Sequence, residues 1–314
     1  MESQHLKDGK NISKMRVKNL NIVERPSWKK KEQYLNINLS RNVPFDDFIN
    51  KKTNKILANN SKNILHYADP FEVYNSISRY YKIPLSKLTV GFGATDLLNR
   101  LAKVLDVDKF YVVKPTFEAF PVYCDINFKK KEYIEKSDIY KKRNRSCIYI
   151  VNPNGVDGSA YKIAPKIFKL YKYVLVDEVY SDYFTKISLL KKNINNLIVV
   201  KSLSKSLGLA GIRVGFCKAS KSITKKIQSV RLSQVCNSYA PIVVPKIINY
   251  TKDMIKRMND TKQYIENKYE CKKSYSNYVL FKKENNLTKK FGARKVLGFH
   301  RMALTNISRI KKYE

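Results

Sequence analysis

Residues 201–216 read KSLSKSLGLAGIRVGF, and this stretch is the central motif of the chain. Lys205 stands between two serines, precedes a glycine-rich segment and is followed eight residues later by Arg213. A lysine that forms a Schiff base must be held rigidly and stay partly unprotonated, and a nearby positive charge lowers its pKa. The hydroxyls of Ser202 and Ser204 and the guanidinium of Arg213 are donors suited to a phosphate group. The stretch therefore predicts a reactive lysine beside an anion-binding site.

Short apolar runs rich in β-branched residues alternate with helical segments around this stretch. Four of these runs are expected to be buried strands, at residues 110–113, 146–151, 173–176 and 197–200. The alternation predicts an α/β fold with a parallel or mixed sheet covered by helices. Unusual polar residues follow each run directly. Because ligands bind outside the carboxyl ends of the strands in such sheets, we expect the chemistry at that edge.

The chain is strongly basic. Its 314 residues include 62 Lys plus Arg against 26 Asp plus Glu, a formal net charge of +36. The basic residues occur along the whole chain, and the abundance of Lys, Asn, Ile and Tyr is typical of AT-rich codon usage. No zinc-finger, RNP or basic-zipper pattern accompanies the charge, so nucleic-acid binding is not expected. We therefore attribute most of the charge to composition and not to a specific function, although a basic surface can attract anionic substrates towards a cleft.

The sequence favours a cytoplasmic protein without a metal site. No uninterrupted apolar run reaches the ~18 residues of a transmembrane helix, and the N-terminal MESQHLKDGK lacks the apolar segment of a secretory signal. The five cysteines are scattered without CxxC spacing. This usage fits reduced thiols better than a disulfide framework or a zinc site.

The pattern predicts a division of the chain into three parts. These are a basic N-terminal arm at 1–35, a large domain at 60–220, and a smaller domain made of 36–59 and 221–314. The smaller domain is expected to be α+β, with helical stretches near 222–235 and 245–266 and a hairpin-like region at 275–281 and 298–305.

The segment around Lys205 resembles the cofactor-lysine motif of fold-type I pyridoxal-phosphate enzymes, in particular the histidinol-phosphate aminotransferase branch of the class I and II aminotransferases. The resemblance covers roughly residues 39–305, with the motifs in the family's order. It implies a three-layer large domain with a mostly parallel, seven-stranded sheet, as in PLP-dependent transferases, and a shortened α+β domain. It also implies that Lys205 forms a Schiff base with pyridoxal 5'-phosphate, whose phosphate is anchored by Arg213, Ser202 and Ser204.

Three further motifs resemble cofactor-binding elements of the family. Gly93, Ala94 and Thr95 resemble the loop that offers backbone N–H groups to the phosphate at a helix N-terminus. Phe117 matches the residue that stacks on the pyridine ring. In VLVDEVYSDYF, Asp177 matches the carboxylate that keeps the ring nitrogen protonated, and Tyr180 the tyrosine that hydrogen-bonds the 3-oxygen.

The turn NPNGVDG at 152–158 resembles the family's N-P-N-x-P-T-G motif and departs from it in the middle. Asn154 matches the asparagine that contacts the 3-oxygen of the cofactor. Gly155, Val156 and Asp157 replace the usual residues, whereas Gly158 is kept. The resemblance implies that the turn still forms.

Other matches concern the substrate and a second subunit. LSRNVPF at 39–45 resembles the family's entry segment, and HYADP at 66–70 resembles an element whose tyrosine reaches the phosphate of a neighbouring subunit. Tyr67 therefore implies a homodimer with shared active sites. Arg301 matches the arginine that binds the substrate α-carboxylate, and Arg294 a position that binds a substrate phosphate.

The resemblance implies an aminotransferase of amino-acid metabolism that exchanges an amino group between an amino acid and a 2-oxo acid. Lys205, Asp177 and Tyr180 would be its catalytic residues, and phosphorylated substrates resembling histidinol phosphate are among the candidates. A PLP-dependent decarboxylase of the threonine-phosphate decarboxylase type shares all these motifs and remains an alternative. A third alternative is a non-catalytic basic binding protein, against which the intact site residues argue.

Overall fold

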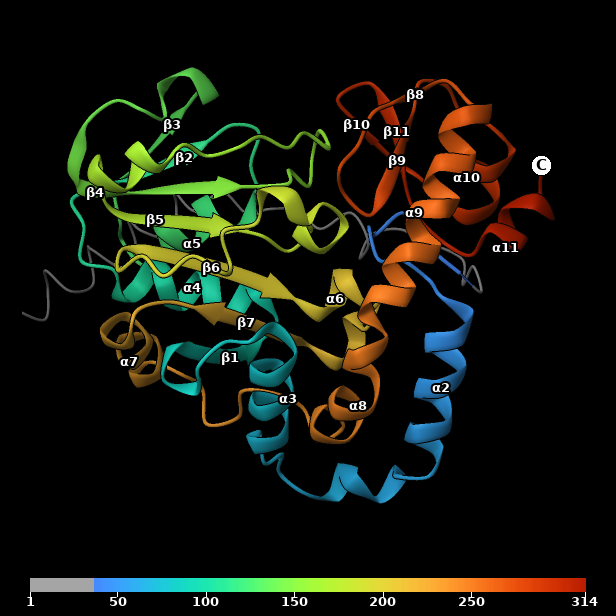
Figure 1. Cartoon of the computed structure of the whole chain (residues 1–314), viewed down its shortest axis with the longest axis horizontal. Helices are drawn as coiled ribbons and strands as arrows, with labels where there is room; N and C mark the ends of the chain where they lie inside the picture. The colour runs from blue at the N-terminus through green and yellow to red at the C-terminus, as the bar shows by residue number, and fades with distance from the viewer. Residues whose placement is uncertain (1–36) are drawn as a thin grey trace, which may run out of the picture.

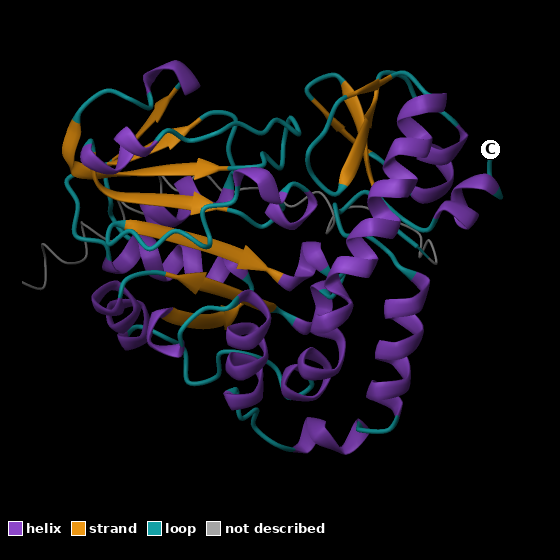
Figure 2. Cartoon of the chain, in the orientation of Figure 1, coloured by secondary structure: helices purple, strands orange, loops and turns teal. Residues whose placement is uncertain are grey.

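The structure, a computed structural model, describes residues 37–314, so the arm expected at 1–35 lies outside the described residues. The chain forms a seven-stranded and a four-stranded sheet, with helices packed around both (Figures 1 and 2). The large sheet contains β1 (Leu88–Phe92), β2 (Phe110–Val113), β3 (Lys131–Ile134), β4 (Arg143–Val151), β5 (Tyr171–Asp177), β6 (Leu197–Ser202) and β7 (Val214–Lys218). The small sheet contains β8 (Cys271–Lys272), β9 (Tyr278–Phe281), β10 (Arg294–Val296) and β11 (Phe299–Ala303). The helices are α2 (Asp47–Ala58), α3 (Phe71–Tyr81), α4 (Ala94–Val104), α5 (Ala119–Ile126), α6 (Leu203–Ser206), α7 (Lys221–Ser229), α8 (Ala240–Ile247), α9 (Thr251–Lys268), α10 (Asn286–Phe291) and α11 (Ile307–Lys311).

The large sheet is mostly parallel, as predicted. Its strand order is β1-β7-β6-β5-β4-β2-β3, and β3, β2, β4, β5 and β6 pair in parallel, whereas β7 is antiparallel to both of its neighbours. The four strands predicted from apolar runs are β2, β4, β5 and β6. The strand β7 was not predicted, because Gly215 interrupts its apolar pattern and Lys218 ends it after only five residues.

Both faces of the central strands of the large sheet are buried, which explains why β4, β5 and β6 are apolar without alternation over most of their length, whereas the edge strand β3 is largely exposed. In β5, Val174 and Val176 face one hydrophobic cluster and Leu175 faces the other. The first cluster includes residues of α3 and α8, and the second includes residues of α4, α5 and α7. The three-layer architecture expected from the resemblance is therefore confirmed.

The small sheet and the chain segment before α2 are joined by backbone hydrogen bonds. β11 pairs antiparallel with β9 and β10, so the expected hairpin-like region is present. The Ala303 N–H donates to the Leu39 carbonyl (3.1 Å), and Phe45 forms a parallel bridge with Thr305. The predicted helix at 245–266 is in fact two helices, α8 and α9, separated by a short 3-10 turn at Ile248–Tyr250. The strands β4, β5 and β6 point towards the side of the molecule where α6, α9 and the small sheet lie (Figure 1).

Candidate active site

Lys205 lies on the four-residue helix α6, which begins directly after β6. The side chain of Ser202 caps this helix by accepting from the Ser204 N–H (3.2 Å). The Lys205 Nζ donates to the backbone carbonyl of Asn42 (2.8 Å). Burial, followed by the positive charges of Arg301 and Arg213, lowers the pKa of Lys205 from its ordinary value of 10.5 to about 8. A partly unprotonated amine near neutral pH, as the sequence predicted, is therefore available at this position.

An anion cradle lies next to Lys205, where Arg213 meets the N-terminus of α4. The Arg213 Nη2 is 3.4 Å from the Thr95 Oγ1, and its Nη1 donates to the Ala210 carbonyl (3.2 Å). Gly93 precedes α4 with φ +82°, and within the described part of the chain no side-chain cap is present at the free N–H groups of this helix. A Cβ on Gly93 would lie 2.5 Å from the Arg213 Nη2, so only glycine leaves room for the guanidinium.

The strand β7 also passes close to the N-terminus of α4. A Cβ on Gly215 would lie 2.4 Å from the Ala94 nitrogen, so glycine is needed at this position. The Ser204 Oγ is buried and has no hydrogen-bond partner among the described residues. An orphaned hydroxyl, an uncapped helix N-terminus and a guanidinium together fit a phosphate group. Ser202 is less available to a phosphate than Ser204. Its hydroxyl oxygen caps α6, and the hydroxyl donates to the Val214 carbonyl (3.4 Å).

Asp177 ends β5 and carries a buried carboxyl group. Its Oδ2 accepts from the Tyr149 hydroxyl (3.0 Å), and its Oδ1 accepts from the Val179 N–H (3.2 Å). Burial raises the pKa of Asp177 to about 6, with these two hydrogen bonds acting in the opposite direction. The carboxyl group is therefore mostly ionised at pH 7 and fits a partner that is a protonated ring nitrogen.

Tyr180 follows three residues later and is also buried. Its hydroxyl oxygen accepts from the Asn42 Nδ2 (2.8 Å), and its ring packs edge-on against Tyr278 with centroids 6.3 Å apart. Burial raises the pKa of Tyr180 to about 12, so the hydroxyl keeps its proton at neutral pH. Phe117, which follows β2, is 39% exposed, so its side chain is accessible to a ligand.

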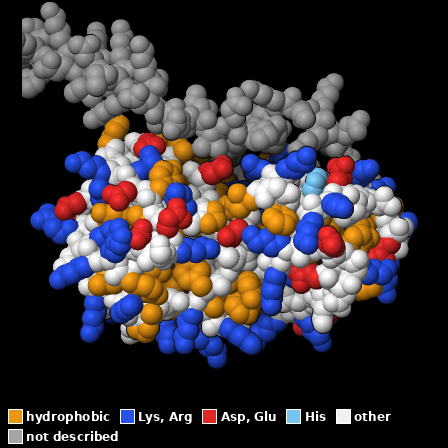
Figure 3. Space-filling model, turned by 90° about the horizontal axis from the view of Figure 1, so that it is seen from above, with side chains coloured by type: hydrophobic (Ala, Val, Ile, Leu, Met, Phe, Trp, Pro, Cys, Tyr) orange, Lys and Arg blue, Asp and Glu red, His pale blue; other side chains and the backbone are white. Residues whose placement is uncertain are grey.

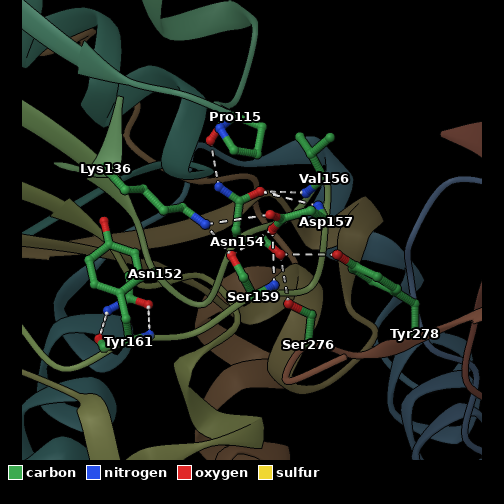
Figure 4. A network of polar contacts seen from close by, with 10 residues as sticks. All are labelled: Pro115, Lys136, Asn152, Asn154, Val156, Asp157, Ser159, Tyr161, Ser276 and Tyr278. Atoms are coloured by element: carbon green, nitrogen blue, oxygen red, sulfur yellow. Dashed lines mark hydrogen bonds and ion pairs between the residues drawn. The ribbon is translucent and has the colours of Figure 1, made fainter. Parts of the chain in front are cut away.

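The turn at 152–158 forms in spite of its unusual residues, and Asn154 holds it (Figure 4). The Asn154 Oδ1 accepts from the N–H groups of Val156 (2.8 Å) and Asp157 (3.4 Å), while its Nδ2 donates to the Pro115 carbonyl (2.5 Å). Asp157 accepts from the Ser159 hydroxyl (2.7 Å) and lies 3.5 Å from the Lys136 ammonium. Asn154 is thus mainly a turn-forming residue, and the second hydrogen of its amide is the group left for the predicted ligand contact.

Arg301 projects from β11 against the same turn. Its Nη1 donates to the Gly155 carbonyl (2.7 Å), and its guanidinium lies 5.4 Å from the centre of the Tyr278 ring. Its Nε is buried and without a partner among the described residues. Arg294 on β10 is directly opposite Arg301 in the antiparallel register. Because directly opposed like charges repel, this pair is suited to an anion that contacts both.

Tyr67 is not part of the site within one chain, since it is 89% exposed in the segment before α3. Asn42 and Tyr149, in contrast, contact the predicted site residues and were missed by sequence reasoning. Asn42 lies inside the entry segment 39–45, so that motif was a signal for its position. Tyr149 lies in the middle of an apolar strand, where nothing distinguishes it from a core tyrosine.

The remaining chemistry of the described residues is limited. No cluster of His, Cys, Asp or Glu in the described part of the chain could hold a metal ion. None of the helices between residues 37 and 314 is long and apolar enough to cross a membrane. All five cysteines are unpaired, as predicted. Figure 3 shows basic side chains spread over the visible face with acidic ones between them, so no single basic stripe gathers there.

Comparisons with known proteins relate the chain to one family. The family model described as aminotransferase class I and II matches residues 36–271. A protein named histidinol-phosphate aminotransferase 2 from Archaeoglobus fulgidus is 29% identical over 177 residues, which is 52% of each chain. A histidinol-phosphate aminotransferase from Blochmanniella floridana is 29% identical over 254 residues, covering 70% of this chain and 71% of that protein. The match to the Archaeoglobus protein thus spans about half of its length.

Solved structures share the fold at low sequence identity. Histidinol-phosphate aminotransferase from Sinorhizobium meliloti, solved in complex with pyridoxal-5'-phosphate, superposes with a TM-score of 0.72 at 15% identity and 94% coverage of both chains. L-threonine-O-3-phosphate decarboxylase from Porphyromonas gingivalis superposes with a TM-score of 0.67 at 18% identity, covering 84% of this chain and 95% of the other. These likenesses confirm the predicted fold.

Proposed function

Because the chain belongs to the class I and II aminotransferase family, we propose that it is a pyridoxal-phosphate-dependent aminotransferase acting on an amino acid and a 2-oxo acid. The observation that carries the proposal is the buried amine of Lys205 beside the anion cradle of Arg213, Ser204 and the start of α4, where burial and nearby positive charges lower its pKa to about 8. The complex of the Sinorhizobium meliloti relative with pyridoxal-5'-phosphate supports this cofactor. The charges of Arg301, Arg213 and the buried Asp177 all act on the same amine.

The residues present fit the cofactor group by group. Its phosphate would be held by Arg213, the Ser204 hydroxyl and the N–H groups at the start of α4, including those of Ala94 and Thr95, with Ser202 supporting them. Asp177 would bind the ring nitrogen and Tyr180 the 3-oxygen. Phe117 would cover one face of the ring, and Asn154 would offer its remaining amide hydrogen. When bound, the cofactor supplies an electron-poor ring that stabilises negative charge at the substrate α-carbon.

Lys205 would act as the general base of the reaction. Its pKa near neutrality lets the Nζ accept a proton from the substrate α-carbon and return it at pH 7 to 8. The charges of Arg301 and Arg213 favour the unprotonated amine, so the groups that bind the anions also prepare the base. Asp177 would offer its negative charge to the ring nitrogen and favour the protonated form of that nitrogen.

Arg301 would bind the substrate α-carboxylate. Its Nη1 donates to the Gly155 carbonyl, while its buried Nε has no partner among residues 37–314, so the Nε and Nη2 edge is open to a two-point contact there. Arg294 faces the same side of the small sheet and would meet a second anionic group on the substrate. This arrangement supports an acidic or phosphorylated amino acid that carries a second anionic group besides its α-carboxylate.

We also propose a cytoplasmic homodimer. Tyr67 and its neighbours Leu65 and Phe71 are 89%, 74% and 60% exposed, and such clustered apolar side chains favour an interface. The unpaired cysteines support a reducing compartment. Light scattering of the purified protein measures the oligomeric state, and Tyr67→Ala should weaken cofactor binding if the tyrosine reaches a neighbouring site.

Absorbance spectroscopy tests the proposed function. Protein reconstituted with pyridoxal phosphate should gain a visible absorbance band, and Lys205→Ala should abolish it because no other amine replaces Nζ. Lys218→Ala is the matched control, since Lys218 is a half-buried lysine with a lowered pKa that contacts only backbone carbonyls away from the site. A wild-type protein that stays colourless would refute the proposal.

A second assay separates the alternatives. Incubation with amino acids and a 2-oxo acid gives amino-group transfer for an aminotransferase, and carbon dioxide without transfer for a decarboxylase. The decarboxylase alternative shares the motifs and the fold of the Porphyromonas gingivalis neighbour, but it is less supported because the relatives found by sequence are named aminotransferases. A basic binding protein would show salt-dependent retention of nucleic acid and no cofactor band.

A further inference from the structure

Asn42 lies in the entry segment and contacts two proposed cofactor-binding residues at once. Its backbone carbonyl accepts from the Lys205 Nζ (2.8 Å), and its side-chain Nδ2 donates to the Tyr180 hydroxyl oxygen (2.8 Å). Only 3% of the residue is exposed. A single residue from outside the large sheet therefore links the reactive amine to the buried phenol.

The backbone around Asn42 is built to bring it there. Asn42 has φ +60°, the left-handed conformation that asparagine tolerates better than most residues. The Phe45 N–H donates to the Leu304 carbonyl (3.0 Å), so the small sheet holds the segment in place. On the other side, a Cβ on Gly208 would lie 2.5 Å from the Pro44 carbonyl oxygen, so this glycine lets the segment approach α6.

A second asparagine fixes the carbonyl of Asn42. The Asn277 Nδ2 donates to it (3.1 Å), alongside the donation from Lys205. Asn277 is fully buried and precedes β9 of the small sheet. The orientation of the Asn42 peptide is thus set by the small sheet and is offered to Lys205 as a fixed acceptor.

The side chain of Asn42 sets the direction of the Tyr180 hydroxyl. Because the phenol oxygen accepts from the Asn42 amide, the hydrogen of the phenol itself remains for another acceptor. A phenol whose oxygen accepts a hydrogen bond is also a stronger donor. The Asn42 Oδ1 is buried without a partner among the described residues, a cost that is typical of residues kept for function.

We propose that Asn42 is a positioning residue whose amide directs the hydroxyl hydrogen of Tyr180 towards the cofactor's 3-oxygen while its carbonyl holds the Lys205 amine. This inference rests on the proposed function, under which Tyr180 and Lys205 both contact pyridoxal phosphate. Asn42 is argued to act through Tyr180, so its effect depends on that hydroxyl being present.

Asn42→Gly separates the two contacts, because glycine keeps the left-handed backbone and the carbonyl but removes the amide. The readout is the pH midpoint of the absorbance change of the protein loaded with pyridoxal phosphate. We expect the midpoint to rise by about half a pH unit, since a weaker donor stabilises an ionised 3-oxygen less. In a Tyr180→Phe background the same substitution should cause no further change.

Lys82→Gly is the matched control, because Lys82 has φ +56° at the exposed end of α3 and should leave the midpoint unchanged. An Asn42→Gly midpoint equal to that of the wild type, or an equal rise with and without the Tyr180 hydroxyl, would overturn the inference. A wild-type protein without an absorbance band refutes the proposed function instead. If Asn42→Gly does not fold, Asn42→Asp keeps the shape and turns the donor into an acceptor, and its rise must then be smaller in the Tyr180→Phe background.

Discussion

Replacing Lys205 by methionine should make the cofactor-free protein more stable, although it removes the proposed catalytic base. Lowering the pKa of Lys205 from 10.5 to about 8 corresponds to about 3 kcal/mol, since one pKa unit is worth about 1.4 kcal/mol. Methionine keeps a similar length without the charge but loses the hydrogen bond to the Asn42 carbonyl, worth about 1 kcal/mol. The free energy of unfolding of Lys205→Met should therefore exceed that of the wild type by about 2 kcal/mol at pH 7.

The pH dependence of this difference has a definite sign. Below about pH 8 the amine is protonated in both the folded and the unfolded chain, so the full penalty of burying its charge is present. Between pH 8 and 10.5 the folded chain releases the proton while the unfolded chain keeps it, so the wild type becomes more stable relative to the variant. Urea denaturation at pH 7 and pH 10 measures both values, and other titrating groups cancel in the difference.

Lys201→Met is the control, because this lysine is 2% exposed and its charge is paired. The Lys201 Nζ lies 3.0 Å from the Asp182 Oδ1 and donates to the Ser181 hydroxyl (2.6 Å). Its removal leaves Asp182 without its ion-pair partner and should lower the free energy of unfolding by about 3 kcal/mol. A Lys205→Met protein that is less stable than the wild type at pH 7, or a difference that does not change with pH, would contradict the reasoning.

Two further predictions concern the walls of the site. Tyr149→Phe removes the hydroxyl that donates to Asp177 and should raise the pKa of that carboxyl group above about 6, because burial is then opposed by one hydrogen bond fewer. The fall of cofactor affinity at acid pH, measured by fluorescence titration, should accordingly move towards neutral pH by about half a pH unit, and an unchanged profile would count against a role for Tyr149. Gly215→Ala places a Cβ 2.4 Å from the backbone nitrogen that opens α4, so urea denaturation should show a loss of about 2 kcal/mol together with weaker phosphate binding. Gly211→Ala has nothing within 4 Å of the new Cβ and serves as its control, and equal losses in both variants would argue against the close approach.

Much of the fold could be predicted because its signals are local. The apolar runs of β2, β4, β5 and β6 are buried on both faces, so their composition alone identified them. The antiparallel strand β7 escaped prediction because its sequence is interrupted by Gly215, whose role is to approach α4. The boundary between α8 and α9 was not predicted, because the two helices are separated only by a short 3-10 turn that does not interrupt the helical pattern of the sequence.

The predicted site residues were found because parallel strands deliver their following residues to one edge. Asp177 ends β5, Tyr180 follows that strand and Lys205 follows β6, and burial shifts the pKa of all three side chains. Asn154 is different, because its side chain is engaged mainly by the backbone of its own turn and by Pro115. That distinction depends on hydrogen-bond geometry, which the residue type does not reveal.

By itself, the sequence determined the α/β architecture and singled out Lys205 as the candidate reactive lysine, with Arg213 as a candidate anion-binding residue. Both features can be recognised from the spacing of residues that are close together in the chain. The tertiary structure alone decided that the charges of Arg301 and Arg213 lower the pKa of Lys205, and that Asn42 contacts both Lys205 and Tyr180. Such effects act between residues far apart in the chain, and their size depends on burial and distance, which only packing sets.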